Sequence, residues 1–294
     1  MITKLKRKLD NLGQQWKVDR LHHRIHQILS SQNAPKFDRS VQDFQQLQQR
    51  FQPLPEYGYD PINIFRRAST RAVTVSELPG LGTPGLKGLD LATGDGMLGV
   101  LLKAFGHEIT LSDQEDWRVD QAKSLPLVLA NCCHALPLLA DQFDFITSFN
   151  AFEHFSNPAR VMDELIRVTK VGGLMYFNFG PLYCSPWGLH AYRTLRMPYL
   201  QFLFPGELIE KKLNELGIWD LGEKRSQLQY VNRWRPKQYG ELWIRPDIEI
   251  VSREWHRDES HLDVVLTYPE CFGGQGLIID DLVISSISVI LRKK

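Results

Sequence analysis

One stretch constrains the fold of this chain more than any other: residues 88–99, Gly-Leu-Asp-Leu-Ala-Thr-Gly-Asp-Gly-Met-Leu-Gly. A short apolar strand over Gly88–Ala92 runs into Gly94-x-Gly96, and a helix over Met97–Phe105 follows. Glycine tolerates positive φ and lets the backbone approach a ligand closely, while a helix N-terminus favours negative charge. The stretch therefore predicts a strand, a ligand-binding turn and a helix in direct succession.

The same alternation continues downstream. We expect strands over His107–Ser112, Leu125–Asn131, Phe143–Phe149, Leu174–Phe179, Ile248–Trp255 and Ser285–Leu291, and helices over Glu115–Lys123, from Pro158, and over Gly206–Leu216. Strands that alternate with helices imply βαβ units, and so an α/β fold with a doubly wound parallel sheet and helices on both faces.

Two regions depart from this alternation. Residues 1–75 show helical apolar spacing, as in Leu5, Leu9, Leu12 and Trp16, and a second short helix is expected over Val41–Phe51. These apolar stripes are too thin to form a core, so we expect a helical N-terminal extension that packs on a domain over residues 76–294. Residues 181–243 hold 11 of the 31 aromatic residues and read as an inserted segment, whose aromatic residues form either its own core or, as a lid, the wall of a substrate site.

Composition excludes several classes of protein. The 294 residues carry 35 Lys and Arg against 34 Asp and Glu, although residues 1–80 hold 13 basic and 7 acidic residues. Such a near-neutral chain is not typical of a disordered or polyanion-seeking protein. We find no apolar run of membrane-spanning length, no secretory signal and no cysteine pair at zinc-binding spacing. These features predict a cytoplasmic protein with free thiols and no metal.

Two acidic residues limit the possible identity of the cofactor. Asp113 follows Gly94 by nineteen residues, at the end of the next expected strand, where a carboxylate can accept hydrogen bonds from ribose hydroxyls. The glycines formally match the dinucleotide pattern G-x-G-x-x-G, so an NAD-dependent oxidoreductase remains an alternative. Asp90, inside the first strand, suits a cationic or amine-bearing ligand better than a pyrophosphate.

Further motifs carry a family resemblance. The stretch Asp90-x-Ala92-x-Gly94-x-Gly96 resembles acid-x-Gly-x-Gly-x-Gly, with Ala in place of the first Gly. Leu-Pro-Leu at 136–138, Gln-Phe-Asp-Phe-Ile-Thr-Ser-Phe-Asn-Ala-Phe-Glu-His-Phe at 142–155 and Leu-Ile-Arg-Val-Thr-Lys-Val-Gly-Gly at 165–173 follow. Together, residues 86–180 resemble the class I S-adenosylmethionine-dependent methyltransferases, in particular their small-molecule type 11 branch. The resemblance implies a Rossmann-like seven-stranded sheet with a reversed last strand, S-adenosylmethionine as cofactor and S-adenosylhomocysteine as product.

The resemblance also implies where the cofactor binds. Asp90 and the Ala92–Gly96 loop correspond to the contact with its methionine part, Asp113 and Gln114 to the ribose contact, and Phe149-Asn150 to the wall near the methyl group. Cys132-Cys133 replaces the usual Asp-Ala pair beside adenine. The implied cofactor residues are Asp90, Ala92, Gly94, Gly96, Asp113, Gln114, Cys132, Cys133, Phe149 and Asn150. Tyr57, Tyr59, Arg66 and Arg71 are further candidates for its carboxylate.

The acceptor is expected to be small. Methylases of nucleic-acid amino groups carry [Asp/Asn]-Pro-Pro-aromatic after the fourth strand, whereas this chain reads Asn150-Ala151-Phe152. We therefore expect no nucleic-acid partner and O-methylation of a small, largely apolar metabolite of the natural-product type. Tyr183, Trp187, Tyr192 and Phe202 are the expected substrate wall. N- or C-methylation, and a non-catalytic ligand-binding protein on the same fold, remain alternatives.

Two histidines are candidate general bases for an O-methyltransferase. His190 follows the expected fifth strand and His154 follows the fourth, so both lie where an acceptor should bind. Neutral histidine has a pKa suited to this task. No carboxylate cluster indicates a catechol-type metal site. The acceptor, the methylated atom and the oligomeric state are left open.

Overall fold

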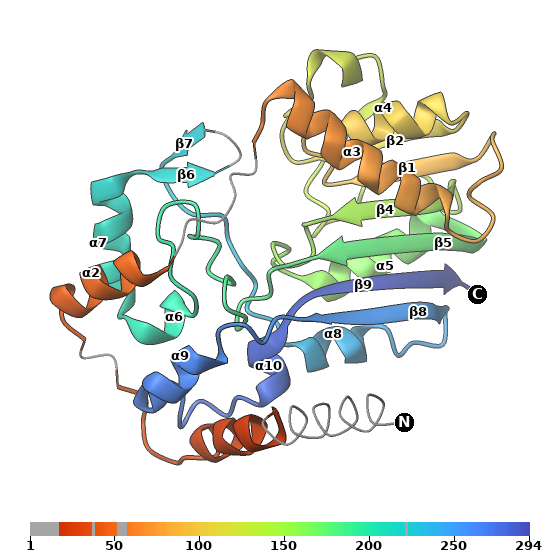
Figure 1. Ribbon diagram of the computed structural model, residues 1–294. Helices are drawn as coiled ribbons and strands as arrows, with labels where there is room; N and C mark the ends of the chain where they lie inside the picture. The colour runs from red at the N-terminus through yellow and green to blue at the C-terminus, as the bar shows by residue number, and fades with distance from the viewer. Residues whose placement is uncertain (1–17, 37–38, 52–57, 221–222) are drawn as a thin grey trace, which may run out of the picture.

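The computed structural model describes residues 18–36, 39–51, 58–220 and 223–294. Seven strands form one sheet in the spatial order β3-β2-β1-β4-β5-β9-β8. Their bounds are β1 Lys87–Leu91, β2 Glu108–Asp113, β3 Leu127–Leu129, β4 Phe143–Phe149, β5 Thr169–Phe179, β8 Ile248–Arg257 and β9 Ile284–Lys293. Strands β1 to β5 are parallel, while β9 runs antiparallel to both of its neighbours (Figure 1). The predicted doubly wound sheet with a reversed last strand is confirmed.

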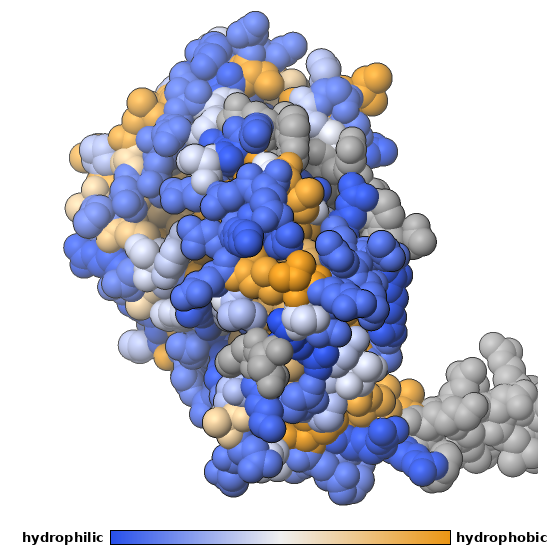
Figure 2. Space-filling view, turned by 90° about the vertical axis from the view of Figure 1, so that its left-hand side faces the viewer, coloured by the Kyte–Doolittle hydropathy of each residue, from blue (hydrophilic) through white to orange (hydrophobic). Residues whose placement is uncertain are grey.

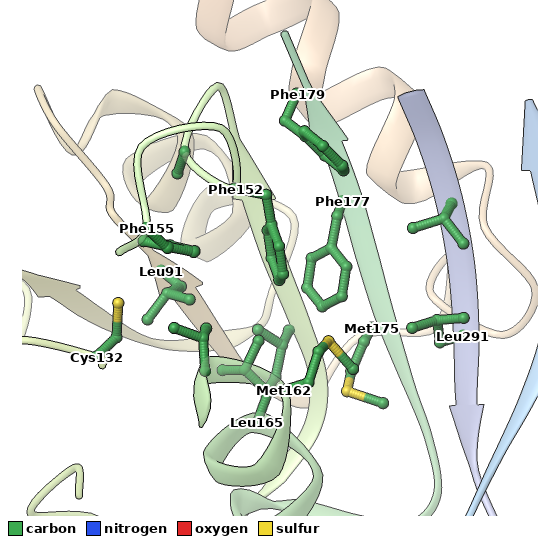
Figure 3. Packing of buried hydrophobic residues seen from close by; sticks show 14 of the residues in the cluster. Leu91, Cys132, Phe152, Phe155, Met162, Leu165, Met175, Phe177, Phe179 and Leu291 are labelled. Carbon is green, nitrogen blue, oxygen red and sulfur yellow. The ribbon is translucent and has the colours of Figure 1, made fainter. Parts of the chain in front are cut away.

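Helices cover both faces of this sheet (Figure 1). They are α3 Pro61–Ser76 and α4 Met97–Ala104 on one face, and α5 Pro158–Val168 and α8 Pro236–Leu242 on the other. Strand side chains alternate between the faces, so Phe145 and Tyr176 pack with the first pair of helices and Ile146 and Phe177 with the second. Figure 3 shows the core on the second face, where Phe177 packs among aromatic and sulfur-containing side chains.

A second lobe lies beside the end of the sheet where the parallel strands terminate (Figure 1). It contains a helix over residues 18–29, α2 Val41–Arg50, α6 Leu200–Leu203, α7 Gly206–Leu216, β6 Ile218–Asp220, β7 Glu223–Arg225, α9 Leu262–Thr267, the 3₁₀ turn η2 Pro269–Cys271 and α10 Ile279–Val283. Ile25 and Phe44 share one hydrophobic core with Leu213 and Phe272. The N-terminal helices therefore pack on the inserted segment and on the chain between β8 and β9. The boundary expected at residue 75, between the N-terminal extension and the main domain, stays a prediction.

The helix α3 differs from the two helices before it. Its buried Ala72 and Val75 belong to the core of the sheet domain, and it packs along α4. Pro61 stands at its first turn, and the side chain of Asp60 accepts hydrogen bonds from the backbone N–H groups of Ile62 and Asn63. This helix carries residues of the N-terminal segment to the sheet.

Several expected elements change length. The helix expected over Glu115–Lys123 is wrong: only a 3₁₀ turn, η1 Asp120–Ala122, forms there. The guanidinium of Arg118 binds the Asp116 carboxylate and donates a hydrogen bond to the carbonyl of Leu125. These hydrogen bonds hold the segment as a loop instead of a helix. Strand β3 is shorter than expected and β5 begins earlier than expected. The expected helices over Val41–Phe51 and Gly206–Leu216 are confirmed within a residue. The helix expected over Leu5–Trp16 lies outside the described residues.

The surface supplies one further observation. No helix in the described part of the chain is long and apolar enough to cross a membrane. The face shown in Figure 2 is mostly hydrophilic, with small hydrophobic patches between polar residues. In the second lobe, Tyr199, Phe204 and Phe272 are fully buried.

Candidate active site

The glycine-rich turn between β1 and α4 forms the floor of the site. Ala92, Gly94 and Gly96 all have positive φ, at 54°, 57° and 73°. A Cβ added at Gly96 would meet Ala122 at 2.8 Å, whereas one added at Gly94 would meet nothing within 4 Å. Gly96 is therefore required by packing, while Gly94 borders open space that a ligand can enter. Ala92 adopts a conformation that costs a non-glycine residue about 1 kcal/mol.

Asp113 holds this turn in place. Its carboxylate accepts hydrogen bonds from the backbone N–H of Gly94 at 2.9 Å and from that of Gln114 at 2.7 Å. Partial burial is the main cause that raises the pKa of Asp113. The structure thus brings the three residues together at the ends of β1 and β2, as the sequence predicted.

Asp90 lies beneath the turn and is 3% exposed. It accepts hydrogen bonds from the hydroxyls of Thr93 at 2.6 Å and Thr147 at 3.1 Å. Burial raises the pKa of Asp90 to about 6, against the opposing effect of these two hydrogen bonds. Sequence reasoning missed both threonines, although Thr93 lies inside the motif itself.

Arg71 of α3 lies above the same edge of the sheet. Its guanidinium carbon is 4.8 Å from the ring centroid of Phe149. Burial raises the pKa values of both Asp90 and Glu153, and the positive charge of Arg71 opposes this increase. Of the other candidates for the cofactor carboxylate, Arg66 hydrogen-bonds Asn63, and Tyr59 lies against Arg67 and Arg193. Tyr57 lies outside the described residues.

The two cysteines have different surroundings. Cys132 is 5% exposed and packs with Leu91 and Phe155 in the core of Figure 3. Burial raises the pKa of its thiol to about 12, so it stays protonated. Cys133 is only partly buried, and its sulfur accepts a hydrogen bond from the hydroxyl of Ser156 at 3.4 Å. Of the pair, Cys133 is the one whose side chain is open to a ligand.

The end of β4 carries the residues expected near the transferred methyl group. Phe149 is partly buried and Asn150 is exposed. Asn150 has a φ of 51° and donates its backbone N–H to the carbonyl of Asn178 in β5 at 2.8 Å. This turn directs the chain away from the sheet and into the loop that holds Glu153 and His154.

The structure brings His154 and His190 together, with ring centroids 4.8 Å apart. His154 Nδ1 lies 2.6 Å from the carbonyl oxygen of Tyr230, and His190 Nε2 lies 2.8 Å from that of Pro181. Burial is the main cause that lowers the pKa of His190 to about 3. His190 is therefore neutral and only weakly basic.

Glu153 completes this group and was not assigned a role from the sequence. It is 1% exposed. One carboxylate oxygen accepts a hydrogen bond from the backbone N–H of Gly180 at 3.0 Å, and the other, Oε2, has no hydrogen-bond partner. Burial raises its pKa. The available signal was an acidic residue directly after the apolar pair Ala151-Phe152, since a buried carboxylate needs a partner or a function.

The four expected substrate-wall residues occupy three places. Tyr192 lies 6.2 Å from the ring of His190 and 6.5 Å from that of Trp187. Tyr183 lines a cavity of about 430 Å³ between α7 and residues 226–233. Phe202 is 5% exposed and packs on Phe272 inside the lobe. It supports the wall and does not line that cavity.

Comparison with known proteins agrees with this geometry. The family model for a methyltransferase domain matches residues 89–177, from β1 through the turn and Asp113 to β5. The strand order with its reversed β9 is the order that this family implied. The chain carries a class I S-adenosylmethionine-dependent methyltransferase domain.

Curated proteins with a similar sequence match this chain over part of its length. One is 2-methyl-6-phytyl-1,4-hydroquinone methyltransferase 1, chloroplastic, of Oryza sativa subsp. japonica, 28% identical over 130 residues, which are 42% of this chain and 38% of that protein. Another is the ubiquinone biosynthesis O-methyltransferase of Coxiella burnetii, 29% identical over 138 residues, which are 42% of this chain and 59% of that protein. The chain thus spans less than two thirds of either relative.

Solved structures of other methyltransferases are similar to this chain. An S-adenosylmethionine-dependent methyltransferase from Mesorhizobium loti is 16% identical, with a TM-score of 0.46, over 77% of this chain and 98% of that chain. The fold of the methyltransferase domain is nevertheless established by its own strand order and not by this likeness.

Proposed function

We propose that this protein transfers a methyl group from S-adenosylmethionine to an oxygen atom of a small, largely apolar acceptor. The proposal rests on two groups of residues that lie at the same edge of the sheet, one suited to the cofactor and one suited to the acceptor. The Gly94 turn, held by Asp113, borders open space at the ends of β1 and β2, and His154 and His190 meet beyond the ends of β4 and β5. Ligands of open α/β sheets bind at this edge.

The residues present fit the cofactor. The open space at Gly94 admits a close backbone contact, and the Asp113 carboxylate beside it is a hydrogen-bond acceptor for ribose hydroxyls. Asp90 supplies negative charge beneath the ammonium and sulfonium groups, and Arg71 supplies positive charge for the carboxylate. Gly96, Ala92, Gln114, Cys132, Cys133, Phe149 and Asn150 complete the proposed contacts.

When bound, S-adenosylmethionine supplies an activated methyl group, so the protein mainly aligns the acceptor. We assign this alignment to His154 and His190, which come from different loops and converge on one point. Each keeps one ring nitrogen outside its hydrogen bond to a backbone carbonyl. Because His190 is a weak base, we assign it to binding the acceptor hydroxyl rather than to removing its proton alone.

The second lobe supports an apolar acceptor. Tyr183 and Leu189, which precede His190 in the chain, line the cavity of about 430 Å³ together with Phe204 and Ile209. The ring of Tyr192 lies near those of both His190 and Trp187. We propose that residues 181–243 cover the acceptor. Both curated relatives are named for quinone or hydroquinone chemistry, which suggests an aromatic hydroxyl as the acceptor group.

The cellular compartment of the enzyme is part of the same proposal. The structure shows no disulfide bond at any of the four cysteines, Cys132, Cys133, Cys184 and Cys271, and thiols are typical of a reducing compartment. We propose a cytoplasmic enzyme of natural-product metabolism that acts on a small molecule and not on nucleic acid.

The first test is a thermal-shift comparison of S-adenosylhomocysteine with NAD on the full chain. We expect stabilisation by S-adenosylhomocysteine alone, because a ligand that binds only the folded state raises the melting temperature. Stabilisation by NAD alone would instead identify an oxidoreductase. The second test follows labelled methyl transfer to alkylated hydroquinones, matched anilines and a nucleic acid. Binding without transfer to any acceptor would indicate a ligand-binding protein.

A further inference from the structure

Three side chains with metal-binding atoms meet at the acceptor side of the proposed site. One ligand atom from each of Glu153, His154 and His190 can be chosen so that all three lie within 4.8 Å of one another. Glu153 and His154 lie in the loop after β4, and His190 lies in the lid segment after β5. No metal was expected from the sequence, because the three residues are not spaced as a metal-binding motif.

The hydrogen bonds of the two histidines leave suitable nitrogens free. A backbone carbonyl only accepts, so His154 Nδ1 donates to Tyr230 and His190 Nε2 donates to Pro181. His154 Nε2 and His190 Nδ1 then keep lone pairs. Metal-binding histidines are commonly oriented in this way, with the second ring nitrogen donating to a carbonyl or carboxylate.

Glu153 adds an independent observation. Its side chain is 1% exposed, and Oε2 is buried without a hydrogen-bond partner. Oε1 lies 3.9 Å from Nε2 of His154, so the carboxylate lies beside the free nitrogen of that histidine. A buried carboxylate oxygen without a donor is costly unless a proton or a cation satisfies it.

We propose that Glu153, His154 and His190 bind one divalent transition-metal ion, which holds the oxygen atom of the acceptor. Two imidazole nitrogens and one carboxylate oxygen favour Fe²⁺, Mn²⁺ or Zn²⁺ over Mg²⁺ and Ca²⁺, which prefer oxygen ligands. Three protein ligands leave positions open for another molecule. This inference rests on the proposed methyl transfer, since it assigns the acceptor to those positions. The two histidines then hold the acceptor oxygen through the ion and not by direct hydrogen bonds.

The distances allow such a site after a small adjustment. Two atoms that each lie about 2.1 Å from one ion are at most about 4.2 Å apart. The 3.9 Å between His154 and Glu153 satisfies this limit, whereas the largest separation of 4.8 Å requires a closure of about half an ångström. His154, whose side chain is 19% exposed, has room to supply it.

The ion would assist the reaction by activating the acceptor. A hydroxyl bound to a divalent cation loses its proton more readily, and here the proton passes to water. The oxygen then forms a bond to the methyl carbon while the bond from that carbon to sulfur breaks, and its electron pair stays on sulfur. This step requires no strong protein base.

The test measures metal binding and cofactor binding separately. The full chain is treated with a chelator, dialysed and titrated by calorimetry with Mn²⁺, Zn²⁺ and, as a spectroscopic probe, Co²⁺. We expect one site per chain, with affinity reduced at least tenfold in His154→Gln and in Glu153→Gln. His134→Gln is the matched control, because His134 is exposed and lies outside the cluster. S-adenosylhomocysteine binding by every variant shows that it is folded.

The outcomes separate this inference from the proposed function. If the wild-type protein binds S-adenosylhomocysteine but none of the three metals, the metal site is overturned and the methyltransferase proposal stands. Equal metal affinity in the wild type and in both cluster variants also overturns it, because the ion would bind elsewhere. Failure of the wild type to bind S-adenosylhomocysteine overturns the proposed function, whatever the metal result.

Discussion

Replacement of Gly94 by alanine tests whether the turn after β1 binds the cofactor. The backbone φ of 57° costs alanine about 1–2 kcal/mol, partly offset by about 0.4–1 kcal/mol from the stiffer unfolded chain. We expect a net loss of about 1 kcal/mol, or about 2–4 °C in melting temperature. The new methyl group meets no protein atom within 4 Å, so it would project into the space assigned to the cofactor. We expect S-adenosylhomocysteine to bind at least about tenfold more weakly, a loss of about 1.4 kcal/mol.

Gly172→Ala is the matched control for this variant. Gly172 has a φ of 80°, and a Cβ there also meets nothing within 4 Å. It lies near the start of β5, at the opposite edge of the sheet from the Gly94 turn. Both variants should lose similar stability in thermal unfolding, but only Gly94→Ala should lose affinity in calorimetry. Wild-type affinity in Gly94→Ala, or equal losses of affinity in both variants, would refute the placement of the cofactor at this turn.

Three further predictions concern the same edge of the sheet. Ala92→Gly relieves a φ of 54° and should raise the free energy of unfolding by up to about 1 kcal/mol in chemical denaturation; a loss of stability would show that the alanine methyl group is needed for packing. Asp90 has a folded pKa of about 6 against an unfolded value of 3.8, so the unfolded state ionises first as the pH rises. The stability of wild type relative to Asp90→Asn should therefore fall by up to about 3 kcal/mol between pH 3 and pH 7, and a pH-independent difference would contradict this pKa. Arg71→Met should weaken S-adenosylhomocysteine binding at least about fivefold but spare 5′-methylthioadenosine, which lacks the carboxylate; equal weakening of both ligands would argue against an Arg71–carboxylate contact.

Local patterns in the sequence were sufficient to predict the α/β class of the domain and its first strand, turn and helix. The strand, turn and helix over residues 88–105 depend on apolar runs and on glycines that reach positive φ, and these are properties of neighbouring residues. The place of Asp113 follows as well, because parallel strands β1 and β2 end at the same edge. The reversed β9 came from the family resemblance and not from periodicity, and the order of the strands came from the structure.

Two predictions failed for different reasons. Residues 115–123 read as a helix, but Arg118 binds Asp116 and the carbonyl of Leu125, so local side-chain hydrogen bonds hold a loop with one 3₁₀ turn instead. Phe202 read as part of a substrate wall because it is aromatic, yet its ring packs on Phe272, seventy residues later in the chain. That second partner cannot be identified from spacing along the sequence.

The sequence by itself determined the α/β frame, the glycine turn and the two acids that line it. Only the tertiary structure decided that Arg71 lies above Phe149, that Phe202 is part of a core, and that Glu153, His154 and His190 share one site. The physical reason is the range of the interactions. Helix and strand patterns arise between residues a few positions apart, whereas a buried carboxylate meets the second histidine only after two loops have packed against each other.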